Sequence, residues 1–90
     1  MTRIVRVKPL EGYRLEVEFD DGLVKVVELE EYLFGEVFAP LKDPRVFRQV
    51  ELDRVLGTVV WPTGADFCPD FLRNEAKGKI IRKPRAALSG

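Results

Sequence analysis

The sequence predicts an α+β domain: a mostly antiparallel sheet, built from a three-stranded meander and a second strand pair, with two short helices. The strongest observation is the alternation of apolar and charged residues at positions 13–19, which is typical of a strand that buries one face. Two prolines, Pro44 and Pro69, stand where proline favours the first position of a helix. The chain therefore places strands first and short helices among later strands.

The meander is expected over residues 3–29. A first strand near residues 4–7 ends before a proline, the second covers residues 13–19 and the third covers residues 23–29. The Asp-Asp-Gly sequence at residues 20–22 indicates a hairpin turn, because Gly tolerates positive φ and Asp tolerates the left-handed region. Three valines compete for the inner face of the third strand: Val24, Val26 and Val27.

The middle of the chain predicts shorter elements. A helical turn over residues 30–34 is expected to end at a glycine. Asp43 as an N-cap predicts a helix over residues 44–49. Residues 50–52 and 55–61 favour a second strand pair, whose turn has no clear type.

The end of the chain differs in charge from the rest. A last helix is expected to start at Pro69, which places the folded domain at residues 3–76. Residues 77–90 are expected to form a basic, flexible tail. Residues 1–72 carry a net charge of −5 and residues 73–90 carry +5, so the body is acidic and the tail is basic.

Composition narrows the classes of function. The chain has 90 residues, of which 46% are hydrophobic and 33% charged, as in one globular domain. It contains no His, which removes the commonest general acid–base group and the usual zinc sites. One cysteine and the lack of a membrane-length apolar run favour a cytoplasmic protein without a membrane segment. We therefore expect that the protein is not an enzyme and that it binds no metal and no cofactor.

The stretch over residues 59–70, with the sequence VVWPTGADFCPD, is the densest cluster of distinctive residues. Trp61 is either a core aromatic that ends a strand or an anchor for a protein partner, since Trp is enriched at interfaces. Asp66 either caps the following turn or, with Asp70, receives a basic partner, a cation or a proton in acid–base chemistry. Cys68 is expected to be a partly buried structural thiol rather than a nucleophile, because no His can activate it.

Five basic residues of the tail are candidate nucleic-acid contacts through phosphate groups: Lys77, Lys79, Arg82, Lys83 and Arg85. No aromatic residue is interleaved with them, so stacking on single strands is not expected. The same residues could instead form a solvated tail or dock on an acidic protein. The acidic residues of the body likewise either form a solvated sheet face or attract a basic partner.

Three segments carry a resemblance to a known family: VRVKPL at residues 5–10, VFAPLKDPRVF at residues 37–47 and VWPTGADFCPDFL at residues 60–72. In these segments the chain resembles the bacterial family called domain of unknown function 2442, over about residues 3–73. The resemblance implies a small α+β domain with no established activity, and partners of the toxin–antitoxin or regulatory kind. The chain departs from the family at the last helix N-cap, where Cys replaces the usual small polar residue.

The expected function is therefore a non-enzymatic protein-interaction or regulatory domain. It would hold an unidentified protein partner by an exposed sheet face or edge strand, together with the loop from Trp61 to Asp66. The alternative is a nucleic-acid-binding module that uses the basic tail. A small enzyme or metal-binding protein at Asp66 and Asp70 is the third hypothesis. Free sheet edges and a thin core also favour a homodimer.

Overall fold

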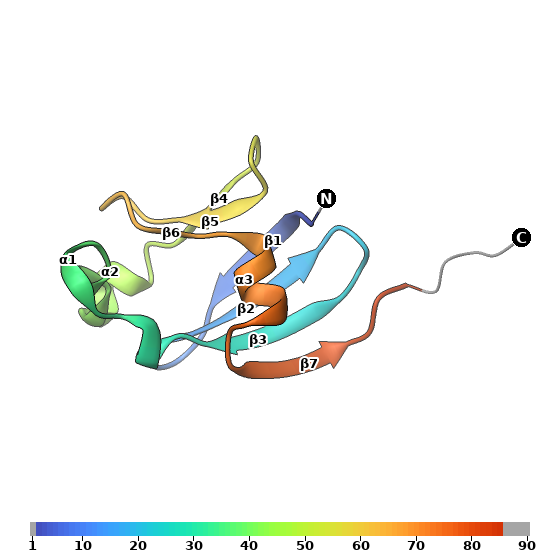
Figure 1. The fold of residues 1–90 in the computed structure, drawn as a ribbon, viewed down its shortest axis with the longest axis horizontal. Helices are drawn as coiled ribbons and strands as arrows, with labels where there is room; N and C mark the ends of the chain where they lie inside the picture. Colours follow the sequence, from blue (N-terminus) through green and yellow to red (C-terminus); the bar gives the residue numbers. More distant parts are fainter. Residues whose placement is uncertain (1, 86–90) are drawn as a thin grey trace, which may run out of the picture.

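Two antiparallel sheets form the framework of the computed structural model, which describes residues 2–85 (Figure 1). The larger sheet contains, in spatial order, β1 (Ile4–Pro9), β2 (Arg14–Phe19), β3 (Val24–Glu28) and β7 (Gly78–Arg82). The smaller sheet contains β4 (Glu51–Asp53), β5 (Thr58–Val60) and β6 (Asp66–Phe67). The predicted α+β class, with its meander and second strand pair, is confirmed.

Short helical segments join the strands. They are η1 (Glu30–Tyr32), α1 (Gly35–Phe38), η2 (Ala39–Lys42), α2 (Pro44–Phe47) and α3 (Pro69–Asn74), where η marks a 3-10 helix. The two predicted helices are α2 and α3. The Asp43 side chain accepts a hydrogen bond from the backbone N–H of Arg45 at 2.9 Å, as expected of an N-cap, although α2 ends two residues earlier than predicted. No periodic signal marks α1 and η2, because Gly35 and Pro40 interrupt that segment.

The alternating residues of β2 lie on the core face, as predicted. Its fully buried side chains are Leu15, Val17 and Phe19. In the register of β3, Val27 lies opposite Leu15 and Lys25 lies opposite Val17, so both share the core face. Val24 and Val26 lie opposite Glu18 and Glu16 on the other face of the sheet, so of the three competing valines Val27 faces the core.

One cluster of buried residues joins the two sheets and α3. Its large, fully buried side chains are Ile4, Leu15, Val17, Phe19, Val27, Leu29, Leu33, Leu41, Phe47, Val59 and Leu72. Each such side chain stabilises the fold by about 1.5–3 kcal/mol relative to an exposed one. The stacked rings of Phe67 and Phe71, with centroids 5.5 Å apart, connect the smaller sheet to α3. Both sheets therefore depend on the same core.

Lys25 is the polar exception on the core face. Its side chain is only 6% exposed, and its Nζ donates hydrogen bonds to the backbone oxygens of Leu72 at 2.9 Å, Arg73 at 3.1 Å and Ala76 at 2.8 Å. The oxygens of Leu72 and Arg73 belong to the last turn of α3, and Ala76 follows the helix. Carbonyl groups at this end lack helical partners, and the helix dipole favours a cation there. Burial lowers the pKa of the Lys25 ammonium from its ordinary value. Lys25 therefore fixes the end of α3 against β3.

The strand β7 differs from the flexible tail predicted over residues 77–90. It pairs antiparallel with β3, and Gly78 lies opposite Val27. The two backbones approach closely there, because a Cβ atom on Gly78 would lie 2.1 Å from the backbone oxygen of Val26. Gly78 thus makes this strand pairing possible. Residues 86–90 of the predicted tail lie outside the described residues.

Lys25→Met is expected to lower the free energy of unfolding by about 2 kcal/mol, because Met keeps the side-chain volume but leaves the oxygens at the end of α3 without their donor. Urea unfolding followed by far-ultraviolet circular dichroism measures the change. Lys8→Met is the matched control, because Lys8 is an exposed lysine of β1 and its replacement should change the free energy by less than about 0.5 kcal/mol. Unchanged stability of Lys25→Met would contradict the capping role.

Candidate functional site

The strand β7 is an edge of the larger sheet. It is the last strand in the order β1-β2-β3-β7, and all 5 of its residues are exposed. Ile80 is 52% exposed and Ile81 is 53% exposed, although isoleucine is among the residue types most often buried. Figure 1 shows β7 along the border of the sheet, next to β3. Such an edge offers backbone N–H and C=O groups to another strand.

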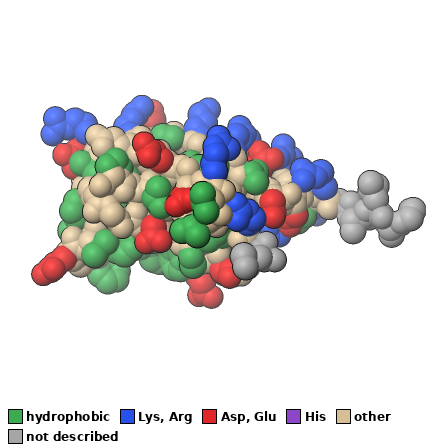
Figure 2. Space-filling model, turned by 90° about the horizontal axis from the view of Figure 1, so that it is seen from above, with side chains coloured by type: hydrophobic (Ala, Val, Ile, Leu, Met, Phe, Trp, Pro, Cys, Tyr) green, Lys and Arg blue, Asp and Glu red, His purple; other side chains and the backbone are tan. Residues whose placement is uncertain are grey.

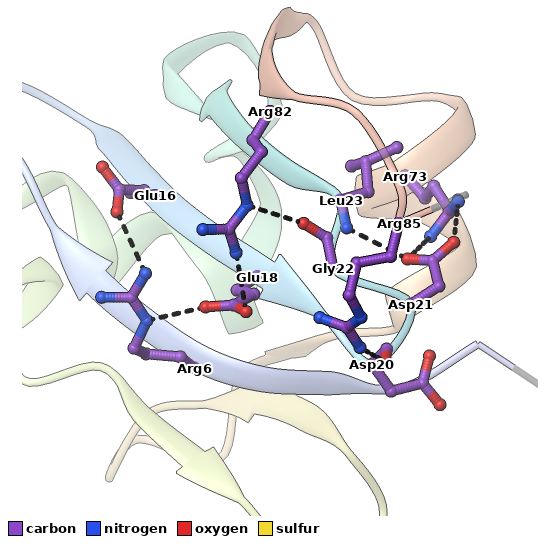
Figure 3. A network of polar contacts seen from close by, with 10 residues as sticks. All are labelled: Arg6, Glu16, Glu18, Asp20, Asp21, Gly22, Leu23, Arg73, Arg82 and Arg85. Carbon is purple, nitrogen blue, oxygen red and sulfur yellow. Dashed lines mark hydrogen bonds and ion pairs between the residues drawn. The ribbon is translucent and has the colours of Figure 1, made fainter. Parts of the chain in front are cut away.

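A network of polar contacts holds β7 in place (Figure 3). Arg82 donates from Nε to the backbone oxygen of Gly22 at 3.0 Å, and its Nη2 contacts the Glu18 carboxylate at 2.8 Å. From the other side, Arg6 Nε donates to Glu18 at 3.0 Å. Both arginines are about half-exposed, so each ion pair contributes only about 0.2–1 kcal/mol. Their main effect is to position β7 through its side chains.

The hairpin between β2 and β3 also anchors the residues that follow β7. The backbone N–H of Arg85 donates to the backbone oxygen of Asp21 at 2.8 Å, and Arg85 Nη2 donates to the backbone oxygen of Asp20 at 2.9 Å. The Asp21 carboxylate accepts two hydrogen bonds from Arg73, at 3.1 and 2.6 Å, and the Arg73 guanidinium lies 5.1 Å from the centroid of the Phe19 ring. The hydrogen bond from Arg73 lowers the pKa of Asp21 to about 2.

The five basic residues predicted as nucleic-acid contacts fall into separate environments. Arg82 and Arg85 are bonded to the hairpin, as described above. Lys79 and Lys83 are exposed and form no ion pair with another residue of the range 2–85. Lys77 borders a hollow of about 320 Å³, which it lines together with Glu28, Glu30 and Glu31. The structure therefore does not gather the five residues into one free cationic surface.

Charges of both signs are interspersed on the face of the molecule that Figure 2 shows. In the view of Figure 2, Lys and Arg side chains follow one long border of the molecule, and Asp and Glu side chains lie among them and towards the opposite border. Apolar side chains reach the surface between them. This distribution differs from the uniform basic face that is typical of a nucleic-acid-binding domain.

Trp61 is a core residue. It is 3% exposed, its Nε1 donates to the backbone oxygen of Phe47 at 2.8 Å, and its ring centroid lies 5.9 Å from that of Phe67. Trp61 therefore offers almost no surface to a partner, and its predicted role as a core aromatic at a strand end accounts for it. Asp66 is exposed and lies in β6, opposite Val60.

The remaining polar groups of this stretch are exposed. Asp70 lies in the first turn of α3, and Cys68 occupies the N-cap position without a side-chain capping bond. Cys68 is exposed rather than partly buried as predicted, because the chain comes to the surface between β6 and α3. Among the residues that the structure describes, no group of three or more His, Cys, Asp and Glu side chains could hold a metal ion. Within the same range, no helix has the length and apolar character to cross a membrane.

The sequence patterns did not indicate the exposed isoleucines of β7 or the buried side chain of Lys25. The segment Gly-Lys-Ile-Ile-Arg contains the β-branched pair that is typical of a strand, but its basic surroundings favoured a tail. A lysine in the middle of the apolar strand β3 is also a signal, because a buried ammonium group requires hydrogen-bond acceptors.

The chain belongs to the family described as Protein of unknown function (DUF2442), whose family model matches residues 4–78. The resemblance noted in the sequence is thereby confirmed. The match extends from β1 to the first residue of β7. No curated protein and no solved structure matches the chain.

The ion pair between Asp21 and Arg73 predicts a pH dependence of stability. The pKa of Asp21 is about 2 in the folded chain, compared with its ordinary value of 3.8. The carboxylate therefore stabilises the fold fully at pH values above 3.8, and this contribution is lost as the pH falls towards about 2. In Asp21→Asn, the free energy of unfolding at neutral pH should be lower and should vary less with pH in this window.

Urea unfolding at several pH values between about 2 and about 6 measures both effects. Asp20→Asn is the control, since Asp20 is an exposed carboxylate next to Asp21, and it should keep the pH dependence of the unsubstituted chain. The assignment fails if Asp21→Asn and Asp20→Asn give the same pH profile.

Proposed function

We propose that this chain is a non-enzymatic protein-interaction or regulatory domain, with β7 as its binding element. The observation that carries the proposal is a sheet edge that also presents two half-exposed isoleucines, Ile80 and Ile81. In strand addition, backbone hydrogen bonds supply affinity and alternate side chains supply specificity. The loop from Trp61 to Asp66 can contribute its exposed residues, but not the buried Trp61.

Composition and exposure support a role without catalysis. The chain has no His to serve as a general base. The carboxylates considered for acid–base chemistry, Asp66 and Asp70, are both exposed to solvent. Electrostatic catalysis works best where water is excluded, so these positions favour a surface role for both residues.

We further propose that the partner is a small protein of the toxin–antitoxin or regulatory kind, and that the two meet in the cytoplasm. This part of the proposal is supported by the family resemblance and by the single cysteine of the chain. The acidic body and basic C-terminal part also support this choice of partner, because opposite surface charges steer partners towards each other. A complex of two copies is the simplest competing arrangement, since any free strand edge can pair with itself.

Nucleic-acid binding is the second candidate function. The exposed lysines Lys79 and Lys83 favour it, because lysine contacts phosphate groups without sequence preference. Arg82 and Arg85 are already bonded to the acidic hairpin, so fewer cations remain for phosphate groups. We therefore rank this candidate below protein binding.

Co-expression of the chain with the product of a neighbouring gene is expected to give a complex that persists in size-exclusion chromatography at physiological salt. Ile80→Thr combined with Ile81→Thr should weaken it at least about tenfold, because Thr keeps the strand preference but removes apolar contact area. Val55→Thr is the matched control, since Val55 is 83% exposed and lies outside β7. No complex, or an equally stable complex with the double variant, would contradict the proposal.

A fluorescence anisotropy titration with a labelled DNA duplex at about 50 mM salt tests the second candidate. We expect weak binding or none. If Lys79 and Lys83 do contact phosphates, Lys79→Ala with Lys83→Ala should reduce the slope of log affinity against log salt by about 2, whereas Lys8→Ala should leave it unchanged. Tight binding that depends on both lysines would overturn our ranking of the two functions.

A further inference from the structure

Resting on the proposed interaction role, we infer that the partner segment is an extended acidic peptide that adds to β7 as an outer strand of the larger sheet. Its side chains alternate between apolar residues on one face and carboxylates on the other. The backbone edge, the two faces of β7 and the charges of the sheet each define one feature of this segment.

The two faces of β7 differ in chemistry. Ile80 lies opposite Lys25 and so stands on the core-facing side of the sheet, where it is half-exposed. Lys79, the preceding residue, lies on the other face, where Arg82 contacts Glu18. The register shift between Val24 and Lys25 leaves Ile81 without a partner in β3 and places Arg82 on the face of Lys79. A strand beside residues 78–80 therefore meets an apolar side chain on one face and a cation on the other. Period-2 alternation in the partner satisfies both faces at once.

The signs of the charges across the sheet favour a carboxylate at the outer position. Arg6 of β1 and Arg82 of β7 both contact Glu18 of β2, and Arg82 reaches it across Val24 of β3 (Figure 3). A carboxylate on a strand beside β7 is expected to pair with Lys79 rather than with Arg82, whose guanidinium is already bonded. Cross-strand pairs of opposite charge stabilise a sheet. Lys79 and Lys83 offer two further cations without an ion pair in the range 2–85.

A second copy of the chain fits this edge poorly. If two β7 strands pair antiparallel with Ile80 across from Ile81, then Lys79 faces Arg82 of the other copy. If Ile81 pairs with its own equivalent, Lys79 faces Lys83 instead. Like charges directly across neighbouring strands are destabilising. The register that pairs Ile80 with its own equivalent avoids like charges within β7, so the charges of β7 favour an acidic strand over the other two pairings with a copy.

Contacts within the free chain already hold β7 in its strand conformation. Gly78 is packed against the backbone of Val26, Arg82 is bonded to the Gly22 oxygen, and Arg85 is bonded to the hairpin on both its backbone and its side chain. A pre-organised strand reduces the conformational entropy that association must overcome. The ordering cost then falls on the peptide alone, which is the usual situation in strand addition.

The test uses the full chain and a fluorescein-labelled peptide of alternating Glu and Val, flanked by Ser. Anisotropy at about 50 mM salt should show binding that weakens as salt increases. Two control peptides follow: one with Lys in place of every Glu, and one N-methylated at alternate residues, which lacks the amide donors for strand pairing. Both should bind at least about tenfold more weakly. Amide shifts in NMR spectra should change at residues 78–83.

Protein variants test the same contacts from the other side. Lys79→Glu with Lys83→Glu should weaken the acidic peptide at least about tenfold. Lys8→Glu with Arg48→Glu is the matched control, because both residues are exposed, lie outside β7 and give the same change in net charge. Equal weakening by both pairs, or equal binding of the N-methylated peptide, would overturn the inference. A dimer of the free chain with protected outer amides in β7 would overturn it in favour of a second copy.

The outcome separates the inference from the proposed function. If the acidic peptide does not bind but the co-expressed partner still depends on Ile80 and Ile81, the acidic strand is wrong and the interaction role stands. If neither the peptide nor the partner binds, both the acidic-strand inference and the proposed interaction role are wrong. If the peptide binds at residues 78–83 with the expected charge dependence, both are supported.

Discussion

The ammonium group of Lys25 holds the C-terminal end of α3 against β3, and the placement of the last strand depends on this contact. A helix of 6 residues has few internal hydrogen bonds, so its position comes mainly from tertiary contacts. Once its end is fixed, the chain reverses and enters β7 at Gly78, where the backbone of β3 leaves no room for a Cβ atom. The exposed edge of the sheet is therefore positioned from inside the core.

The acidic body and the basic C-terminal part of the sequence contact each other in the folded chain. Three arginines from the basic C-terminal part reach the acidic hairpin between β2 and β3: Arg73, Arg82 and Arg85. Backbone oxygens of the hairpin thus hold Arg82 and Arg85, and the carboxylates of Asp21 and Glu18 pair with Arg73 and Arg82. The lysines Lys79 and Lys83 remain at the edge, and with the two exposed isoleucines they give β7 a chemistry that differs between its faces.

The sequence was sufficient for the elements that local patterns determine. Alternation at residues 13–19 identified β2 and its buried face, and Asp43 with its following proline located the start of α2. β6 has only 2 residues, which is too few for a periodic signal. β7 depends on Lys25 and Gly78, whose contacts connect segments about 50 residues apart. The candidate site lies on this strand, so sequence reasoning placed it in a flexible tail instead.

Amide hydrogen exchange of the free chain, followed by NMR over residues 77–85, reports whether β7 exists as an edge strand in solution. Amides of β7 that point to β3 should exchange slowly, and those that point outward should exchange quickly. Lys25→Met should speed exchange of the slow ones more than Lys8→Met does. Uniformly fast exchange across residues 77–85 in the unsubstituted chain would contradict the account and restore the flexible tail.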